Sequence, residues 1–193
     1  MFLVVIRYTI AVINRYKSDD RVFAWDLYNE PECSKQIKII LPLLRYIHRA
    51  ARSVENVQQP MTIGIAKWPL TSPLASFELA VSDIISFHVY GPLANVIQNI
   101  TDLRQVQSGR PILCTEWLAR PFGSTIFTHL EYFLREKIGA IQWGLVAGRS
   151  QTYYQWKSPQ NAPMPSMWFH DVLYTNGTAF SSYEEKFYFE LKH

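Results

Sequence analysis

Short β-prone runs alternate with helical segments along this chain, and the alternation limits the folds open to it. The strand-like runs are centred near residues 24, 62, 86, 113 and 141, so their mean spacing is about 29 residues. This interval is close to the length of one strand–helix–strand unit. Strands that alternate with helices form parallel sheets. The sequence therefore predicts an α/β fold.

The predicted strands cover residues 22–28, 61–65, 84–89, 112–115 and 140–143. Helices are predicted through 5–16 and 42–51, over 74–80, 93–107 and 125–137, and from about 182 onward. Pro42 is expected in the first turn of its helix, where a missing N–H costs little. Ser182-Tyr-Glu-Glu185 is expected to form a capping box. A long loop is expected over residues 150–166.

Composition excludes several classes of protein. The 193 residues suffice for one domain with a sizeable core, and 48% hydrophobic with 18% charged residues is typical of a globular chain. The net charge is +3 and the basic residues are scattered, so we expect no nucleic-acid partner. The apolar run at residues 1–6 is interrupted by Arg7 and is too short for a membrane span. The cellular location stays open.

Two glutamates close two of the strand-like runs. Glu30 ends Trp-Asp-Leu-Tyr-Asn-Glu, and Glu116 ends Ile-Leu-Cys-Thr-Glu. Pro31 cannot continue a central strand, so the chain turns directly after Glu30. Paired carboxyl groups at the carboxyl ends of parallel strands are what cleavage of a glycosidic bond requires. The alternatives are a surface glutamate in a turn for Glu30, and a salt bridge or a helix N-terminal carboxylate for Glu116.

The third strand places polar side chains on one face. Alternation in Ser-Phe-His-Val-Tyr-Gly puts Ser86, His88 and Tyr90 together, near the end of the strand. We expect Tyr90 to donate a hydrogen bond that orients a carboxylate nucleophile. His88 is expected to do the same or to contact substrate, and its alternative is a core histidine with satisfied hydrogen bonds.

Aromatic rings and one amide complete the predicted site. Asn29 is placed to bond a sugar hydroxyl, and Trp143 to form the floor below the sugar that is cleaved. Trp117 is predicted as a flat wall beside Glu116, and Trp68 as a stacking ring in a loop. Each tryptophan has the same alternative, which is a place in the core.

Several motifs in this order resemble the clan A glycoside hydrolases, and most closely the family 5 cellulase-like proteins, which include β-glycanases and xylanases. The motifs are Trp-Asp-Leu-Tyr-Asn-Glu-Pro, Ser-Phe-His-Val-Tyr-Gly, Thr-Glu-Trp, Gln-Trp-Gly-Leu-Val and Trp-Phe-His-Asp. The resemblance covers nearly the whole chain. It implies a (β/α)8 barrel, a β-linked glycan as substrate, and no cofactor or metal.

The resemblance also implies roles for the matching residues. Glu30 matches the acid/base and Glu116 the nucleophile of a retaining mechanism, whose carboxyl groups lie about 5–5.5 Å apart. Asn29 matches the asparagine beside the acid, and Trp143 the tryptophan of the eighth strand. His88 and Tyr90 match site residues of the sixth strand.

The five predicted strands correspond to strands four to eight of such a barrel. Residues 1–193 then form a single C-terminal portion of the catalytic domain, a partial barrel, and we expect the chain alone to have little or no hydrolytic activity. One alternative is a truncated, inactive fragment that binds carbohydrate or is completed by another chain. A further alternative is a scaffold that self-associates through the open sheet edge as a stable dimer.

Overall fold

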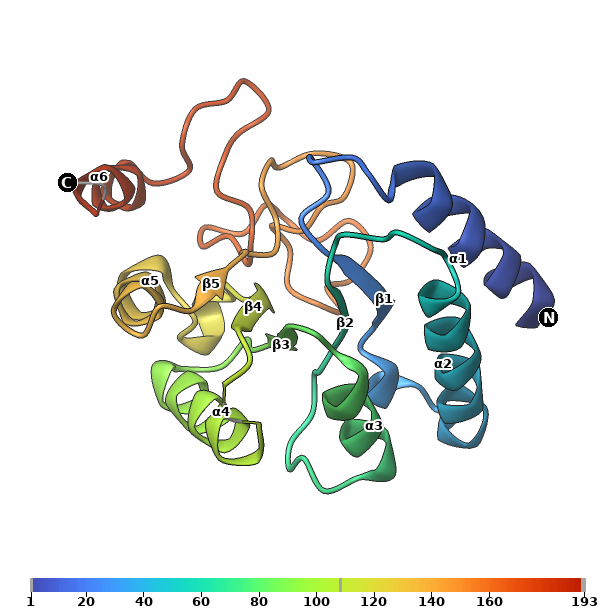
Figure 1. The fold of residues 1–193 in the computed structure, drawn as a ribbon. Coiled ribbons are helices and arrows are strands. Elements are labelled where there is room, and N and C mark those ends of the chain that lie inside the picture. Colours follow the sequence, from blue (N-terminus) through green and yellow to red (C-terminus); the bar gives the residue numbers. More distant parts are fainter. Residues whose placement is uncertain (1, 108, 192–193) are drawn as a thin grey trace. The chain divides into compact units, whose positions relative to one another are not determined.

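The computed structural model describes residues 2–107 and 109–191 (Figure 1). The chain forms two compact units, Met1–Phe87 with Arg104–Ile112, and His88–Leu103 with Leu113–His193. Strands β3 and β4 begin in the first unit and end in the second. The prediction of one domain across residues 1–193 stays a prediction.

Helices alternate with strands in the order that the sequence predicts. The elements are α1 (Phe2–Tyr16), β1 (Trp25–Asn29), η1 (Pro31–Cys33), α2 (Ile37–Arg52), β2 (Met61–Gly64), α3 (Pro73–Val81), β3 (Ile85–His88), α4 (Leu93–Val106), β4 (Ile112–Glu116), η2 (Arg120–Phe122), α5 (Ile126–Arg135), β5 (Gly139–Ala140) and α6 (Ser182–Glu190). The strands form two sheets, with β1 beside β2 in one and the order β3-β4-β5 in the other. Pairing is parallel between β1 and β2 and between β4 and β5. The predicted α/β class with parallel sheets is therefore confirmed.

The first unit packs its helices against β1 and β2. In the described part of this unit, α1 lies beside α2, and Figure 1 draws the two helices in blue to teal. Ile40, Leu44, Ile63 and Leu74 form one buried cluster, drawn from α2, β2 and α3. A parallel bridge between Ile65 and Phe87 continues the pairing toward β3. The apolar stripe of α2 and the fully buried β2 thus form the core expected of a βα unit.

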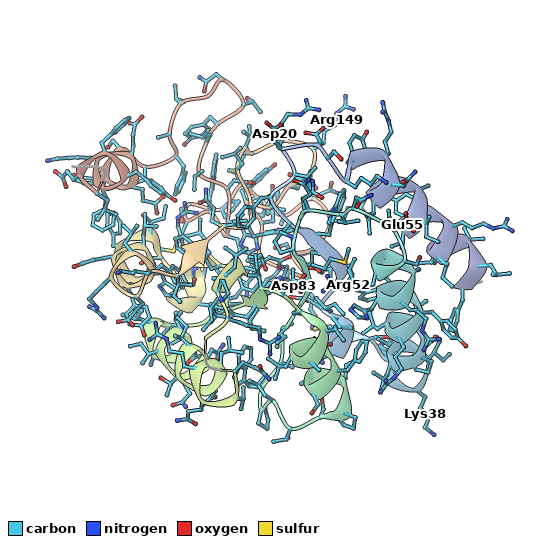
Figure 2. All side chains as sticks on the ribbon, in the orientation of Figure 1. Asp20, Lys38, Arg52, Glu55, Asp83 and Arg149 are labelled. Carbon is cyan, nitrogen blue, oxygen red and sulfur yellow. The ribbon has the colours of Figure 1, made fainter. Side chains whose placement is uncertain are left out.

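An ion pair fastens the end of α2 to the segment before β3. Arg52 Nη2 lies 2.8 Å from Asp83 Oδ1, and both residues are labelled in Figure 2. Asp83 also accepts a hydrogen bond from the backbone N–H of Met61 at 2.8 Å. Burial acts to raise the pKa of Asp83, but the hydrogen bonds from Arg52 and Met61 outweigh it and lower the pKa. This carboxylate therefore joins α2, β2 and the start of β3.

The first unit also buries a pair of carboxyl groups that no local pattern predicts. Glu78 on α3 is fully buried, and Glu32 in η1 is 8% exposed. Burial raises the pKa of Glu78 to about 10, and the charge of Glu32 adds to the increase. Glu78 is therefore protonated in the folded chain at neutral pH.

Glu78→Gln is expected to flatten the dependence of stability on pH. The folded state holds the proton of Glu78 up to a pH of about 10, whereas the unfolded state loses it near the ordinary value of 4.5. The wild-type chain therefore loses stability as pH rises above 4.5, by at most about 1.4 kcal/mol per pH unit, and the variant lacks this loss. Urea unfolding between pH 5 and 8 measures the slope. The exposed Glu55→Gln, at a position labelled in Figure 2, is the control and should keep the wild-type slope.

The second unit has a core of aromatic side chains. The Trp117 ring stacks on His129 of α5 at 5.8 Å between centroids and meets Phe133 edge-on. Helix α5 begins at the cap residue Thr125, whose side chain accepts a hydrogen bond from the N–H of Thr128. The long loop expected over residues 150–166 is present, because no helix or strand is assigned there in the described chain.

Several local predictions differ from the structure, and β1 begins at Trp25 instead of at residue 22. Pro42 lies inside α2 instead of in its first turn, because that helix begins earlier, at Ile37. Helix α6 is capped by Ser181, whose hydroxyl accepts from the N–H of Glu184 at 3.3 Å, because Ser181 has extended backbone and Ser182 is already helical. Strand β5 covers only Gly139–Ala140, although the backbone N–H groups of Ile141 and Trp143 still donate to the carbonyl oxygens of Cys114 in β4 and of Trp117 just after it.

None of the described helices combines the length and the apolar character that a membrane span requires.

Candidate active site

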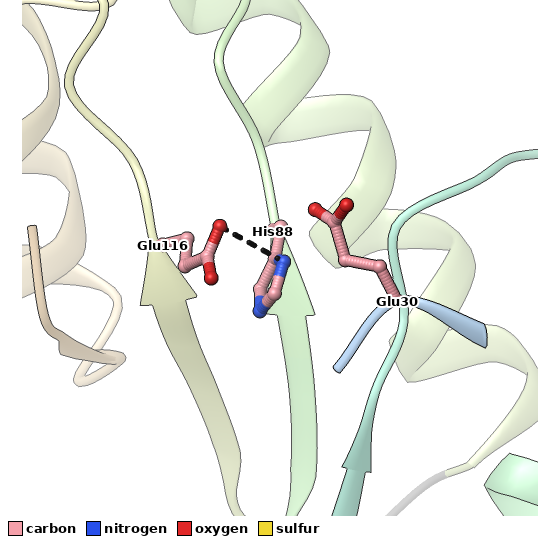
Figure 3. A group of neighbouring side chains, drawn as sticks. All are labelled: Glu30, His88 and Glu116. Atoms are coloured by element: carbon pink, nitrogen blue, oxygen red, sulfur yellow. Dashed lines mark ion pairs between the residues drawn. The ribbon is translucent and has the colours of Figure 1, made fainter. Parts of the chain in front are cut away.

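The carboxylate of Glu116 is held at the end of β4 by two side chains of the third-strand segment. Tyr90 donates a hydrogen bond to Glu116 Oε2 at 2.7 Å, and His88 Nδ1 lies 3.3 Å from the same oxygen. Figure 3 shows His88 at the end of β3 turned toward Glu116, with their ion pair dashed. Glu116 is 9% exposed and His88 4% exposed. The hydrogen bond expected from Tyr90 is present.

The backbone around Glu116 is fixed as firmly as its side chain. The Glu116 carbonyl accepts from the N–H of Val89 at 2.9 Å, which pairs the ends of β3 and β4. Leu118, two residues on, has a φ of +80°, which is a genuine outlier for a bulky residue. Such conformations persist only where the surroundings impose them, and they concentrate at functional sites.

Glu30 belongs to the first unit, where it follows β1, and Figure 3 labels it there. Its backbone is left-handed, with φ 46° and ψ 55°, and η1 starts at the next residue, Pro31. A glutamate in this region costs on the order of 1–3 kcal/mol, so the chain accepts strain to present it. Burial, followed by the charge of Glu30 and a hydrogen bond to it, raises the pKa of Cys33. The Cys33 thiol beside Glu30 thus stays protonated.

The other predicted residues differ in exposure. Asn29 ends β1 and is exposed, and Trp143 is 44% exposed beyond β5. Trp68 is partly buried in the first unit and meets Phe87 edge-on, with centroids 6.2 Å apart. The prediction that Trp117 forms a wall of the site is wrong, because its side chain is 1% exposed. Both described contacts of its ring are with residues of α5. Its ring supports the backbone that follows Glu116 and offers no open face to a sugar.

His170 was not predicted as a site residue, although it lies beside Tyr90 in the cluster of Glu116, Tyr90 and His88 (the Glu116 cluster). His170 is 1% exposed, and its ring centroid lies 5.3 Å from that of Tyr90. It follows a loop without periodicity, so no strand or helix pattern placed it near Glu116. The motif Trp-Phe-His-Asp was the available signal, because a histidine enclosed by large aromatic residues is often buried.

The fold is similar to that of (β/α)8-barrel glycosidases of known structure. The β-glucuronidase of Ruminococcus gnavus matches with a TM-score of 0.69 and 17% identity, over 98% of this chain and 35% of that one. Its complex with D-glucuronic acid matches with a TM-score of 0.67 and 17% identity, over 96% and 36% of the two chains. The complex of the same enzyme with D-glucaro-d-lactam matches with a TM-score of 0.70 and 17% identity, over 98% of this chain and 36% of that one. This chain thus spans about a third of the length of the proteins that it matches.

No protein-family model matches the sequence, and no curated protein sequence matches it. The structural likeness supports a glycoside-hydrolase-like fold, and the α/β architecture with parallel sheets is consistent with a partial barrel. It does not support family 5 in particular over other barrel glycosidases.

Proposed function

We propose that this chain is the catalytic portion of a retaining glycoside hydrolase that cleaves β-O-glycosidic bonds in a polysaccharide or oligosaccharide. Glu116 is the nucleophile and Glu30 the acid/base of the proposed reaction. The observation that carries the proposal is the Glu116 carboxylate, which is buried at the end of a parallel strand and oriented by Tyr90 and His88. Hydrogen bonds donated to a carboxylate favour its ionised, nucleophilic form.

The first proposed step forms a covalent intermediate. An oxygen of Glu116 attacks the anomeric carbon, and the bond from that carbon to the leaving-group oxygen breaks. The protonated carboxyl group of Glu30 gives its proton to the departing oxygen. In the second step the Glu30 carboxylate takes a proton from water, and the water oxygen displaces Glu116 from the anomeric carbon. The product keeps its configuration, and no metal or cofactor takes part.

The remaining predicted residues have supporting roles in the proposal. Asn29 bonds a sugar hydroxyl, Trp143 forms the floor below the cleaved sugar, and Trp68 stacks on a further sugar. Tyr90 and His88 keep the Glu116 carboxylate in the orientation for attack. Membership of family 5, with the five strands as strands four to eight of the barrel, belongs to the same proposal and rests on the sequence motifs.

The second candidate is a non-catalytic barrel fragment that keeps residual carbohydrate binding or is completed by another chain. The specific observation in its favour is that β1 is an edge strand of its sheet in the described structure. A partner strand from a second copy or a complementing chain would add to this edge. Analytical sedimentation of the purified chain distinguishes a monomer from such an assembly.

Covalent trapping tests the catalytic proposal. A 2-deoxy-2-fluoro-β-glycosyl fluoride reacts as a glycosyl donor but leaves an intermediate that water attacks slowly, so even a slow enzyme accumulates it. We expect the chain to gain the mass of one fluoro-sugar, and peptide mapping to place it on Glu116. Donors with glucose, xylose, mannose and glucuronic acid cover the main substrate classes. Absence of labelling with all of them, or a label on a different carboxylate, would contradict the proposal and favour the non-catalytic fragment.

A further inference from the structure

The loop after β5 encloses a polar pocket of its own within the second unit. The pocket has a volume of about 680 Å³ and is formed by residues 150–152 and 154–162 together with His170. Hydroxyl and amide side chains dominate its wall, among them Ser150, Thr152, Gln155 and Asn161. Trp156 also lines it and is 49% exposed. A concave site with polar side chains and an accessible aromatic ring suits a sugar, which presents hydroxyl groups at its edge and C–H groups on its face.

His170, which lines this pocket, carries a buried hydrogen-bond acceptor without a partner in the described structure. Its Nδ1 contacts the carbonyl oxygen of Leu118, and a carbonyl can only accept, so Nδ1 carries the proton. Burial lowers the pKa of His170, so the ring is neutral at neutral pH. Nε2 is then a bare acceptor, buried and without a hydrogen-bond partner in the described structure. A buried acceptor left in this state is costly, and a hydroxyl donor would relieve the cost.

The histidine is held in place from several directions. Arg120 Nη1 donates to the carbonyl oxygens of Trp168, His170 and Asp171 at 3.0–3.1 Å. Gly144 has a φ of +82°, and a Cβ there would come within 2.7 Å of the His170 Cβ, so only glycine lets this segment pack closely. The acceptor is therefore positioned before any ligand arrives.

The pocket adjoins the Glu116 cluster through two rings. The Trp156 centroid lies 4.9 Å from that of Tyr90 and 5.6 Å from that of His170. Tyr90 in turn donates to Glu116. Trp156 thus contacts both the pocket and the tyrosine that holds the proposed nucleophile. His170 Nε2 is buried, so a sugar hydroxyl reaches it only when the rings around it shift slightly.

We propose that this pocket binds a neutral sugar unit of the glycan chain, with a sugar hydroxyl donating to His170 Nε2 and the ring of Trp156 stacking on the sugar. The inference rests on the proposed function for the class of ligand. A uronic acid carries hydroxyl groups as well, so the preference for a neutral sugar rests on charge: the described residues that line the pocket include no buried cation to pair with a carboxylate. Lys157 also lines the pocket, but it is exposed, so water and salt weaken its attraction for acidic sugars.

Binding measured in the Glu116→Gln chain tests the pocket independently of catalysis. Isothermal titration with the β-1,4-linked hexaoses of xylose, mannose and glucose, and with β-1,4-linked hexamannuronate, gives affinities without turnover. We expect at least one neutral hexaose to bind, and more tightly than hexamannuronate. His170→Asn, whose amide can replace Nδ1 but not Nε2, and Trp156→Ala should each weaken binding about tenfold, which is about 1.4 kcal/mol. Tyr183→Ala removes a 78% exposed ring outside the pocket and should leave affinity unchanged.

The outcomes separate the two proposals. Fluoro-sugar labelling of Glu116 together with hexaose affinities that neither His170→Asn nor Trp156→Ala reduces would overturn the pocket and leave the hydrolase. Affinities reduced in both variants without any labelling would overturn the hydrolase and leave the pocket. If His170→Asn fails to fold by circular dichroism, Gln155→Ala takes its place, because that residue is exposed and lines the same pocket. Tighter binding of hexamannuronate would overturn the preference for a neutral sugar.

Discussion

Glu116→Gln is expected to abolish labelling by a 2-deoxy-2-fluoro-β-glycosyl fluoride, whereas Glu30→Gln is expected to leave it within about tenfold of the wild-type rate. Without the Glu116 carboxylate there is no nucleophile to form the glycosyl ester. Fluoride leaves without help from an acid, so the absence of the Glu30 proton matters little for this donor. For a donor with an alkyl leaving group, Glu30→Gln should slow the first step by about 10²–10⁴-fold, which is the usual contribution of a general acid.

Rates of labelling followed by intact-protein mass spectrometry measure both effects. Glu131→Gln is the matched control, since this glutamate is exposed on α5 in the second unit. It should label as the wild type does with every donor. Equal loss in Glu30→Gln for fluoride and alkyl donors would show that Glu30 supports the structure of the site instead of donating a proton.

Arg120→Met is expected to destabilise the chain by about 3–5 kcal/mol. Arg120 forms two hydrogen bonds of 2.7 Å with the carboxylate of Glu184, and the side chains are only 5% and 9% exposed. The substitution leaves a buried carboxylate without its cation, and it removes the donor to the carbonyl oxygens of Trp168, His170 and Asp171. Removing the cation of a buried ion pair lowers the free energy of unfolding far more than breaking an exposed ion pair does.

Urea unfolding measures the change in the free energy of unfolding. The control is Arg135→Met, because the pair of Arg135 with Glu136 is 65% and 26% exposed and should contribute at most about 1 kcal/mol. The double variant Arg120→Met, Glu184→Leu should recover part of the loss, since it leaves no charge unpaired. Equal stability of Arg120→Met and Arg135→Met would mean that the buried pair is solvated more than its burial indicates.

The regular elements were predictable because each depends on a local pattern. Alternating apolar runs identified β2 and β3, and helical spacing identified α2 and α4. The side-chain alternation of the third strand also placed Tyr90 where it can reach Glu116. Errors occurred where one residue decides the outcome, as at Ser181, which takes the cap because its backbone is extended and that of Ser182 is not.

Features that depend on long-range packing were not predictable from the sequence. Trp117 follows Glu116 directly, but the positions of His129 and Phe133 on α5 decide that its ring is buried. Likewise, Glu32 and Glu78 lie 46 positions apart, and nothing local indicates that both are buried. The pairing of Glu30 with Glu116 across a substrate stays a prediction, because it joins residues of the two units.

The left-handed backbone of Glu30 has a consequence for how such a chain evolves. Glycine or asparagine at this position would relieve the strain, so a descendant freed from selection for catalysis gains folding stability by losing the carboxylate. Genetic drift should then remove Glu30 before it removes Glu116, whose backbone is not in this region. Among descendants of this chain, glycine at position 30 would be an early sign that the proposed hydrolysis had been lost.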